Sequence, residues 1–205
     1  MEDLFKQRVC ETAIACAQIY KTEFMDYNYL ICSKAFTLKP FYIINAHADN
    51  FQHLLGVHSL ITAKEFFEKS YNGTLSIEDF DFIKPKQDEK VVKGFVRRKI
   101  KILSTALNIF HNESIMVEEN FIKNRISCSF ATSDNICTLG FENHNYSVPK
   151  TLLKSNELDA QKAQAIDLIL RKNKSDKLFS EVILGSEEAI SEYADTIKDL
   201  INISK

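Results

Sequence analysis

The sequence predicts an α+β fold, with N-terminal helices packed on a small antiparallel sheet and a C-terminal helical tail. Three observations support this prediction. Apolar residues recur at helical spacing near the N-terminus, β-favouring segments separated by turns fill the stretch after residue 114, and helix-opening signals return near the end. With 205 residues, 45% of them apolar, the chain can bury the core of one domain.

The N-terminal third alternates between helix and strand signals. Residues 3–25 have the helical spacing, and residues 27–36 and 41–46 read as two strands of a hairpin. The segment from Asp49 to Gly56 predicts a short helical turn that ends at its glycine. Thr62 and Glu65 have the form of a capping box, so a helix should begin there and end at Asn72-Gly73.

The rest of the chain begins with the longest helical pattern, over residues 88–110. The following segments read as strands: 114–118, 122–131, 136–141 and 146–152. A helix over 160–172, a strand over 178–184 and a final helix from Gly185 to about residue 202 complete the prediction. We expect residues 1–155 to form the main domain and 156–205 a helix–strand–helix extension that belongs to the same globule.

Composition excludes several classes of protein. No apolar run approaches the roughly 18 residues of a membrane span, and the acidic N-terminus lacks the apolar core of a signal peptide, so we expect a cytoplasmic protein. Five widely spaced cysteines predict buried free thiols and no disulfide framework. Because no zinc-binding spacing occurs, we expect no metal and no cofactor.

The net charge of −2 gives no sign of a nucleic-acid partner, but the cations are unevenly placed. No acidic residue lies between Lys90 and Asn112. At about 100° per residue, one face of a helix over 90–110 carries only cations. This basic stripe consists of Lys90, Lys93, Arg97 and Lys101. The opposite face is apolar and predicts buried Phe95, Leu103 and Phe110.

Lys99 falls within that apolar face, and Arg98 lies at its boundary. Two interpretations of Lys99 stay open. Its four-carbon stem can cover apolar surface while the ammonium reaches water. Alternatively, the lysine meets an anion such as a phosphate, since a buried charge needs a partner. His53 also stands out, because a turn that ends at Gly56 fixes its direction and imidazole carries protons near pH 7.

The segment from Tyr27 to Val57 resembles the phage-associated barnase/EndoU/colicin/RelE-like nuclease domains of polyvalent proteins. Those domains carry a phenylalanine–histidine–leucine–threonine–glycine string after a strand pair, and here Phe51, His53, Leu54 and Gly56 match it. Leu55 stands in place of the threonine. The resemblance extends over the helix around Lys99 to the proline and threonine near residue 151, so it covers about residues 27–155.

The resemblance implies a metal-independent endoribonuclease, in which the ribose 2′-hydroxyl attacks the adjacent phosphorus. His53 would transfer the proton, and Lys99 with Arg98 would stabilise the phosphate charge. Thr151 would donate a hydrogen bond to phosphate. Tyr42, Arg97 and Lys101 would bind the RNA substrate, with Tyr42 stacking on a base.

Three hypotheses about the biological role follow from this resemblance. The chain is a toxin or an effector in phage and defence conflicts that cleaves RNA. It is one component of a toxin–antitoxin pair, whose nuclease face an inhibitory, antitoxin-like or immunity-like partner covers. Or it is a catalytically inactive binding module that acts through protein–protein contact, which Leu55 and the mild net charge favour.

Overall fold

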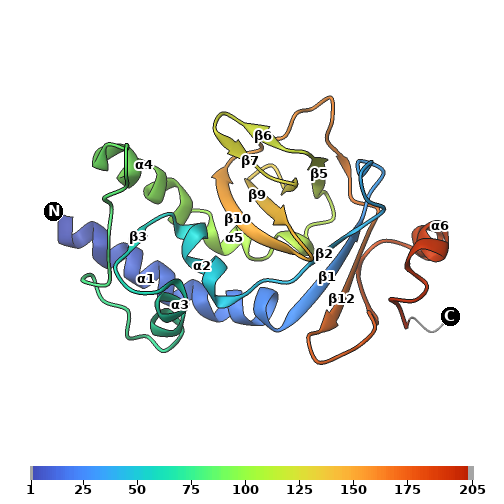
Figure 1. Cartoon of the computed structure of the whole chain (residues 1–205), viewed down its shortest axis with the longest axis horizontal. Coiled ribbons are helices and arrows are strands. Elements are labelled where there is room, and N and C mark those ends of the chain that lie inside the picture. The colour runs from blue at the N-terminus through green and yellow to red at the C-terminus, as the bar shows by residue number, and fades with distance from the viewer. Residues whose placement is uncertain (1, 203–205) are drawn as a thin grey trace.

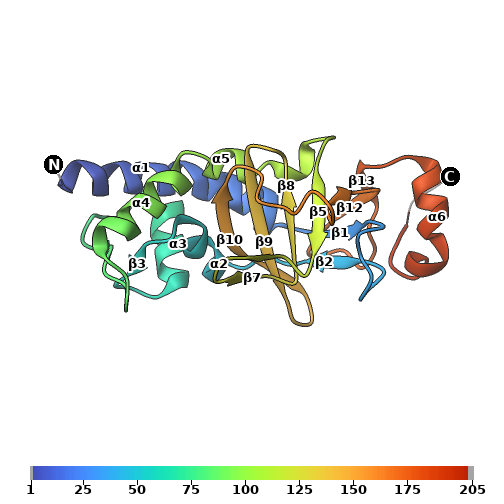
Figure 2. The ribbon, with the colours of Figure 1, turned by 90° about the horizontal axis from the view of Figure 1, so that it is seen from above.

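The computed structural model describes residues 2–202, with side chains from residue 4 onward. A nine-stranded mixed sheet curls into a half-barrel, with strand order β11-β5-β8-β9-β10-β2-β1-β12-β13. Helices α3 and α4 lie toward one end of the molecule, α1 runs from that end to the sheet in the middle, and α6 lies at the other end (Figures 1 and 2).

The N-terminal elements follow the predicted order closely. They are α1 (Glu2–Tyr20), the π-helix η1 (Lys21–Met25), β1 (Tyr27–Cys32), β2 (Tyr42–Ile44), α2 (Ala48–Leu55), β3 (His58–Ser59), α3 (Ala63–Tyr71) and β4 (Phe80–Asp81). The β1–β2 hairpin is confirmed, with Tyr29 opposite Ile44. The predicted capping box of α3 is confirmed in its first half, since the Thr62 hydroxyl accepts a hydrogen bond from the Glu65 amide. The return hydrogen bond from the Thr62 amide to the Glu65 side chain is not formed among the described residues.

Three short helical elements come next along the chain: α4 (Glu89–Ile100), α5 (Leu103–Ala106) and the 3-10 helix η2 (Ile109–His111). The central strands are β5 (Met116–Glu119), β6 (Ile122–Lys123), β7 (Ile126–Ser127), β8 (Phe130–Ser133), β9 (Cys137–Asn143) and β10 (Ser147–Lys154). The chain ends with β11 (Gln164–Ala165), β12 (Leu168–Asn173), β13 (Glu181–Leu184) and α6 (Glu187–Ile197).

The expected small antiparallel sheet is wrong. Strands from both ends of the chain join one large sheet, and it is mixed because β10 runs parallel to β2, with Ser147 beside Ile44. β1 pairs along its whole length with β12, from Tyr27 opposite Asn173 to Cys32 opposite Leu168. Such pairings join residues more than a hundred positions apart, so local patterns cannot reveal them.

The helix expected over 160–172 is also wrong, and so is a C-terminal tail that is mainly helical. This segment forms β11 and β12, and β13 then pairs with β12. The three apolar residues at 168–170 are fully buried in succession, which suits a strand covered on both faces. Only α6 remains helical in this part of the described chain. The division at residue 155 stays a prediction.

The long helix expected over 88–110 is broken between α4 and α5. Leu103 and Phe110 are buried as predicted, but Phe95 is 45% exposed, so its predicted burial is wrong. Within α4 only Val92 and Val96 are buried, which leaves Phe95 beside this narrow stripe. The break after Ile100 resets the helical phase, so burial further along says nothing about Phe95.

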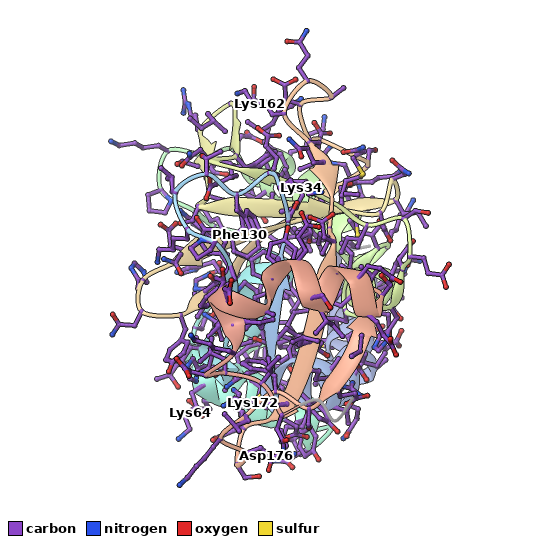
Figure 3. All side chains as sticks on the ribbon, turned by 90° about the vertical axis from the view of Figure 1, so that its right-hand side faces the viewer. Lys34, Lys64, Phe130, Lys162, Lys172 and Asp176 are labelled. Carbon is purple, nitrogen blue, oxygen red and sulfur yellow. The ribbon has the colours of Figure 1, made fainter. Side chains whose placement is uncertain are left out.

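Aromatic rings fill the core between the helices and the sheet. Phe110 lies 4.7 Å from Tyr29 and 5.6 Å from Phe24, measured between ring centroids. Phe130 stacks on Phe141 at 4.8 Å and is fully buried, whereas Lys162 projects from the margin of the molecule (Figure 3). The described residues include five free cysteines, all buried, as the sequence predicted. No helix between residues 2 and 202 has the length and apolar character needed to cross a membrane.

Candidate functional site

A cleft of about 980 Å³ opens between α4 and the β-sheet. One wall is the loop over 84–88 with the exposed side of α4. The opposite wall is formed by the end of β10, the residues that follow it, and the β6–β7 hairpin. Figure 1 shows α4 and this hairpin on either side of β10.

The lining of the cleft is strongly basic. Its cations are Lys84, Lys86, Arg98, Lys99, Lys123, Arg125 and Lys154. Its two carboxylates are already engaged: Asp88 caps α4 by accepting the Lys90 amide at 2.8 Å, and Glu157 pairs with Lys123 at 2.9 Å. Within the described chain, the other six cations have no carboxylate partner. The cleft therefore concentrates uncompensated positive charge in a protein whose net charge is −2.

Lys99, which interrupts the predicted apolar face, lies at the junction of α4 and α2. Its ammonium donates a hydrogen bond of 2.9 Å to the backbone carbonyl of His53 near the C-terminus of α2, where the helix dipole favours a cation. The side chain is half-buried. Burial, reinforced by the charge of Lys84, lowers the pKa of Lys99 to about 7. A half-buried ammonium with no carboxylate partner among the described residues is suited to bind an anion from solution.

Gly56 is what allows Lys99 to take this position. It ends α2 in the left-handed conformation, with φ of 79°, as the sequence predicted. A Cβ atom at this residue would lie 3.0 Å from the Lys99 Cδ and 3.2 Å from its Nζ. Glycine favours the left-handed backbone turn, and its lack of a side chain also leaves room for the lysine stem.

Lys84 is the second cation in this part of the cleft. Burial lowers its pKa below the usual range, and its amine makes no hydrogen bond or ion pair with the described residues. It contributes to the lowered pKa values of both Lys99 and His53. The two lysines therefore repel each other, and an anion bound between them would relieve that repulsion.

His53 lies beside the cleft and is not one of its lining residues. Its side chain is exposed, while its carbonyl holds Lys99. Partial desolvation, followed by the charges of Lys99 and Lys84, lowers the pKa of the His53 imidazole below its usual value. The ring is therefore neutral at pH 7 and able to accept a proton.

Arg98 and Thr151 both line the cleft, from opposite walls. The Arg98 guanidinium lies 4.9 Å from the centre of the Phe95 ring, which also lines the cleft. Thr151 lies on β10 at an irregularity of pairing with β9, between Pro149 and Thr151. Its hydroxyl makes no hydrogen bond to the described residues and can donate one to a ligand.

The other three predicted site residues lie elsewhere. The Arg97 guanidinium lies 4.9 Å over the ring of Phe5, and Lys101 is exposed at the end of α4, outside the lining. Tyr42 is 3% exposed, and its hydroxyl donates to the Glu119 carboxylate at 2.7 Å. A ring packed in the core cannot stack on a base, so Tyr42 is no part of this site.

Sequence reasoning missed five lining cations and Phe95. The cations are Lys84, Lys86, Lys123, Arg125 and Lys154. A signal existed: Lys84-Pro85-Lys86 and Lys123-Asn124-Arg125 are short basic clusters in turn-like segments. Nothing local indicated that the two clusters face each other across one cleft.

Between residues 2 and 202, no three His, Cys, Asp or Glu side chains gather in a way that could hold a metal ion. A basic cleft with an exposed aromatic ring, neutral hydroxyls and a nearby neutral imidazole has instead the character of a site for a phosphate-bearing polyanion.

Comparison with known families defines the class further. Residues 14–188 match the family described as phage-Barnase-EndoU-ColicinE5/D-RelE like nuclease 4, and the chain belongs to this family of nucleases. The resemblance found in the sequence is thereby confirmed, and the match extends past residue 155 to include β12 and β13. No curated protein and no solved structure matches the chain significantly.

Proposed function

We propose that this nuclease is an endoribonuclease that cleaves RNA in the basic cleft, by attack of the ribose 2′-hydroxyl on the adjacent phosphodiester and without a metal ion. The observation that carries the proposal is the Lys99 ammonium, which is half-buried beside Lys84 and has no carboxylate partner in the described part of the chain. The scissile phosphate of a bound RNA would supply the negative charge that these two lysines are without.

His53 acts as the base in this reaction. Its imidazole removes the proton of the 2′-hydroxyl, the 2′-oxygen forms a bond to phosphorus, and the bond from phosphorus to the 5′-oxygen breaks. The products are a 2′,3′-cyclic phosphate and a 5′-hydroxyl. The lowered pKa of His53 supports this role, because a base must be unprotonated at the start of the reaction.

Lys99 stabilises the charge that develops on the non-bridging oxygens. With a pKa of about 7, the same ammonium is also acidic enough to protonate the leaving 5′-oxygen near neutral pH. Lys84 and Arg98 hold the phosphate from the same wall, and the unpaired hydroxyl of Thr151 donates to it from β10. These roles require cations and hydrogen-bond donors, and the cleft provides both.

The potential metal ligands of the cleft support a reaction that needs no metal ion. Both carboxylates of the lining are occupied, one as a helix cap and one in an ion pair, and Mg²⁺ prefers carboxylate and phosphate oxygens. We therefore expect cleavage to survive excess EDTA. A strict requirement for added magnesium or zinc would overturn the mechanism.

The test is cleavage of a mixed-sequence RNA by the wild type, His53→Ala, Lys99→Met and the double variant. Loss of a positioned proton carrier or cation reduces the rate by about 10²–10⁴-fold, and the two losses are far from additive if the residues act together. Exposed residues outside the cleft provide matched controls, His144→Ala and Lys90→Met, which should keep full activity. Folding of each variant is checked by circular dichroism.

Three results would contradict the proposal. Fully active, folded Lys99→Met would leave Lys99 as a lysine whose stem merely covers apolar surface. Equal cleavage of an RNA and of its 2′-deoxy counterpart would exclude attack by the 2′-hydroxyl. If the wild type binds RNA but cleaves none, the chain is a binding module whose site has lost activity.

A toxin or conflict-effector role rests on the same cleft. The six lining cations that lack a carboxylate partner among residues 4–202 form a surface that an acidic inhibitory protein would complement. Expression of the wild type in a bacterial host should then arrest growth, and His53→Ala should be harmless. Equal harmlessness of both forms, with cleavage intact in vitro, would remove the toxin role and leave the nuclease.

A further inference from the structure

Phe95 is the unexplained residue of the cleft. A phenylalanine on a helix next to a core normally turns inward, yet this ring is 45% exposed and faces the basic lining. Val91, one turn earlier on α4, is 50% exposed and lines the same cleft. An apolar strip thus runs along α4 beside cations, where neither the core nor an ion pair accounts for it.

Arg98 packs against this ring, and the two side chains together form what we call the stacking platform. The guanidinium lies over the ring, 4.9 Å from the ring centre, so a base can stack on the guanidinium or on the opposite face of the ring. Nucleobases stack on aromatic rings and on guanidinium planes, whereas amino-acid side chains of an acidic partner would need only the charges. The platform therefore favours a nucleic-acid ligand with an accessible base.

The spacing along α4 fits one nucleotide. Phe95 and Lys99 are four residues apart, which places their Cβ atoms about 5–6 Å from each other on the same side of the helix. A nucleotide whose phosphate meets Lys99 and Lys84 can therefore lay its own or a neighbouring base on Phe95. A base within a duplex is stacked between its neighbours and cannot reach this ring.

We propose that Phe95, with Arg98, stacks an unpaired base of the substrate, so that the cleft selects single-stranded nucleic acid. This inference deepens the proposed function and rests on the same cleft being the substrate site. Stacking does not distinguish the bases, so the preference it creates is for an unpaired strand over a duplex and not for a particular sequence.

The experiment separates base stacking from phosphate binding. Fluorescence anisotropy measures the Kd of a single-stranded DNA, which lacks the attacking 2′-hydroxyl, and of a strand of equal length with abasic sites. Both strands carry the same phosphates. The wild type should prefer the base-bearing strand, and Phe95→Ala should weaken that strand alone, by about 5- to 140-fold for one stacked base.

Two further variants make the result specific. Phe95→Trp keeps an aromatic face and should retain the preference for bases, whereas Phe95→Leu keeps apolar bulk and should lose it. Tyr146→Ala removes a similarly exposed aromatic ring, 49% exposed and outside the cleft, and should change neither Kd. Because Phe95 is outside the core, all these variants should fold.

The outcomes distinguish this inference from the proposed function. If the wild type binds base-bearing and abasic strands equally, or if Phe95→Ala weakens both to the same degree, base stacking is overturned even where RNA is cleaved. If the wild type cleaves no RNA but shows the Phe95-dependent preference, the stacking platform stands and the ribonuclease mechanism falls.

Discussion

Lys99→Met should make the protein more stable while it removes the proposed active-site cation. A lysine whose pKa is lowered in the folded state opposes folding. Below pH 7 both states are protonated, and the folded state bears the unfavourable burial of the charge. Between pH 7 and the usual lysine pKa of 10.5, the folded amine loses its proton before the unfolded one, so wild-type stability rises with pH.

The size of this gain in stability can be worked out from the environment of Lys99. Lowering the pKa from 10.5 to about 7 corresponds to at most about 5 kcal/mol, since one pKa unit is about 1.4 kcal/mol. Lys99 is only half-buried, so residual solvent screens its charge and reduces this value. Loss of its hydrogen bond to the His53 carbonyl offsets about 1 kcal/mol more. We expect a net gain of about 1–3 kcal/mol at pH 6.

Urea unfolding of the wild type and Lys99→Met at pH 6 and pH 9 measures the gain. The variant should be more stable at pH 6, and its advantage should shrink at pH 9. Lys101→Met, an exposed lysine at the end of the same helix, serves as the control and should show no such pH dependence. A variant less stable than the wild type at pH 6, or an advantage equal at both pH values, would refute the reasoning.

Three further outcomes test the fold and the site. Phe110→Ala should destabilise by about 3–5 kcal/mol and Phe95→Ala by less than about 1 kcal/mol in chemical denaturation, because only the first ring is in the core. Burial alone would raise the pKa of Glu119, but hydrogen bonds from Thr37, Tyr42 and Leu38 outweigh it and lower the pKa. Glu119→Gln should therefore cost about 1–3 kcal/mol at pH 7, and less as the pH falls below about 4.3. Binding of single-stranded nucleic acid should weaken steeply with salt, with a log–log slope of about −0.7 for each phosphate contacted.

Local chemistry in the sequence determined the elements whose causes lie within a few residues. The glycine at 56 ends α2, the Thr62 hydroxyl starts α3, and the hairpin over 27–46 pairs as its pattern predicts. Lys99 stands out against its apolar neighbours in the sequence alone, and the fold gives it an environment that lowers its pKa. The family was also readable from the string around His53.

Tertiary structure alone decided the sheet and the cleft. The parallel contact of β10 with β2, and the pairing of β12 with β1, depend on which strand edges meet after the chain folds back on itself. For the same reason, residues 160–172 form β11 and most of β12 and no helix, since the burial of residues 168–170 overrides local propensity. Lys84 and Arg125 line one cleft because the fold brings the loop before α4 and the β6–β7 hairpin to opposite walls of it. Charge and stacking at a site depend on distances in space, and sequence spacing does not contain those distances.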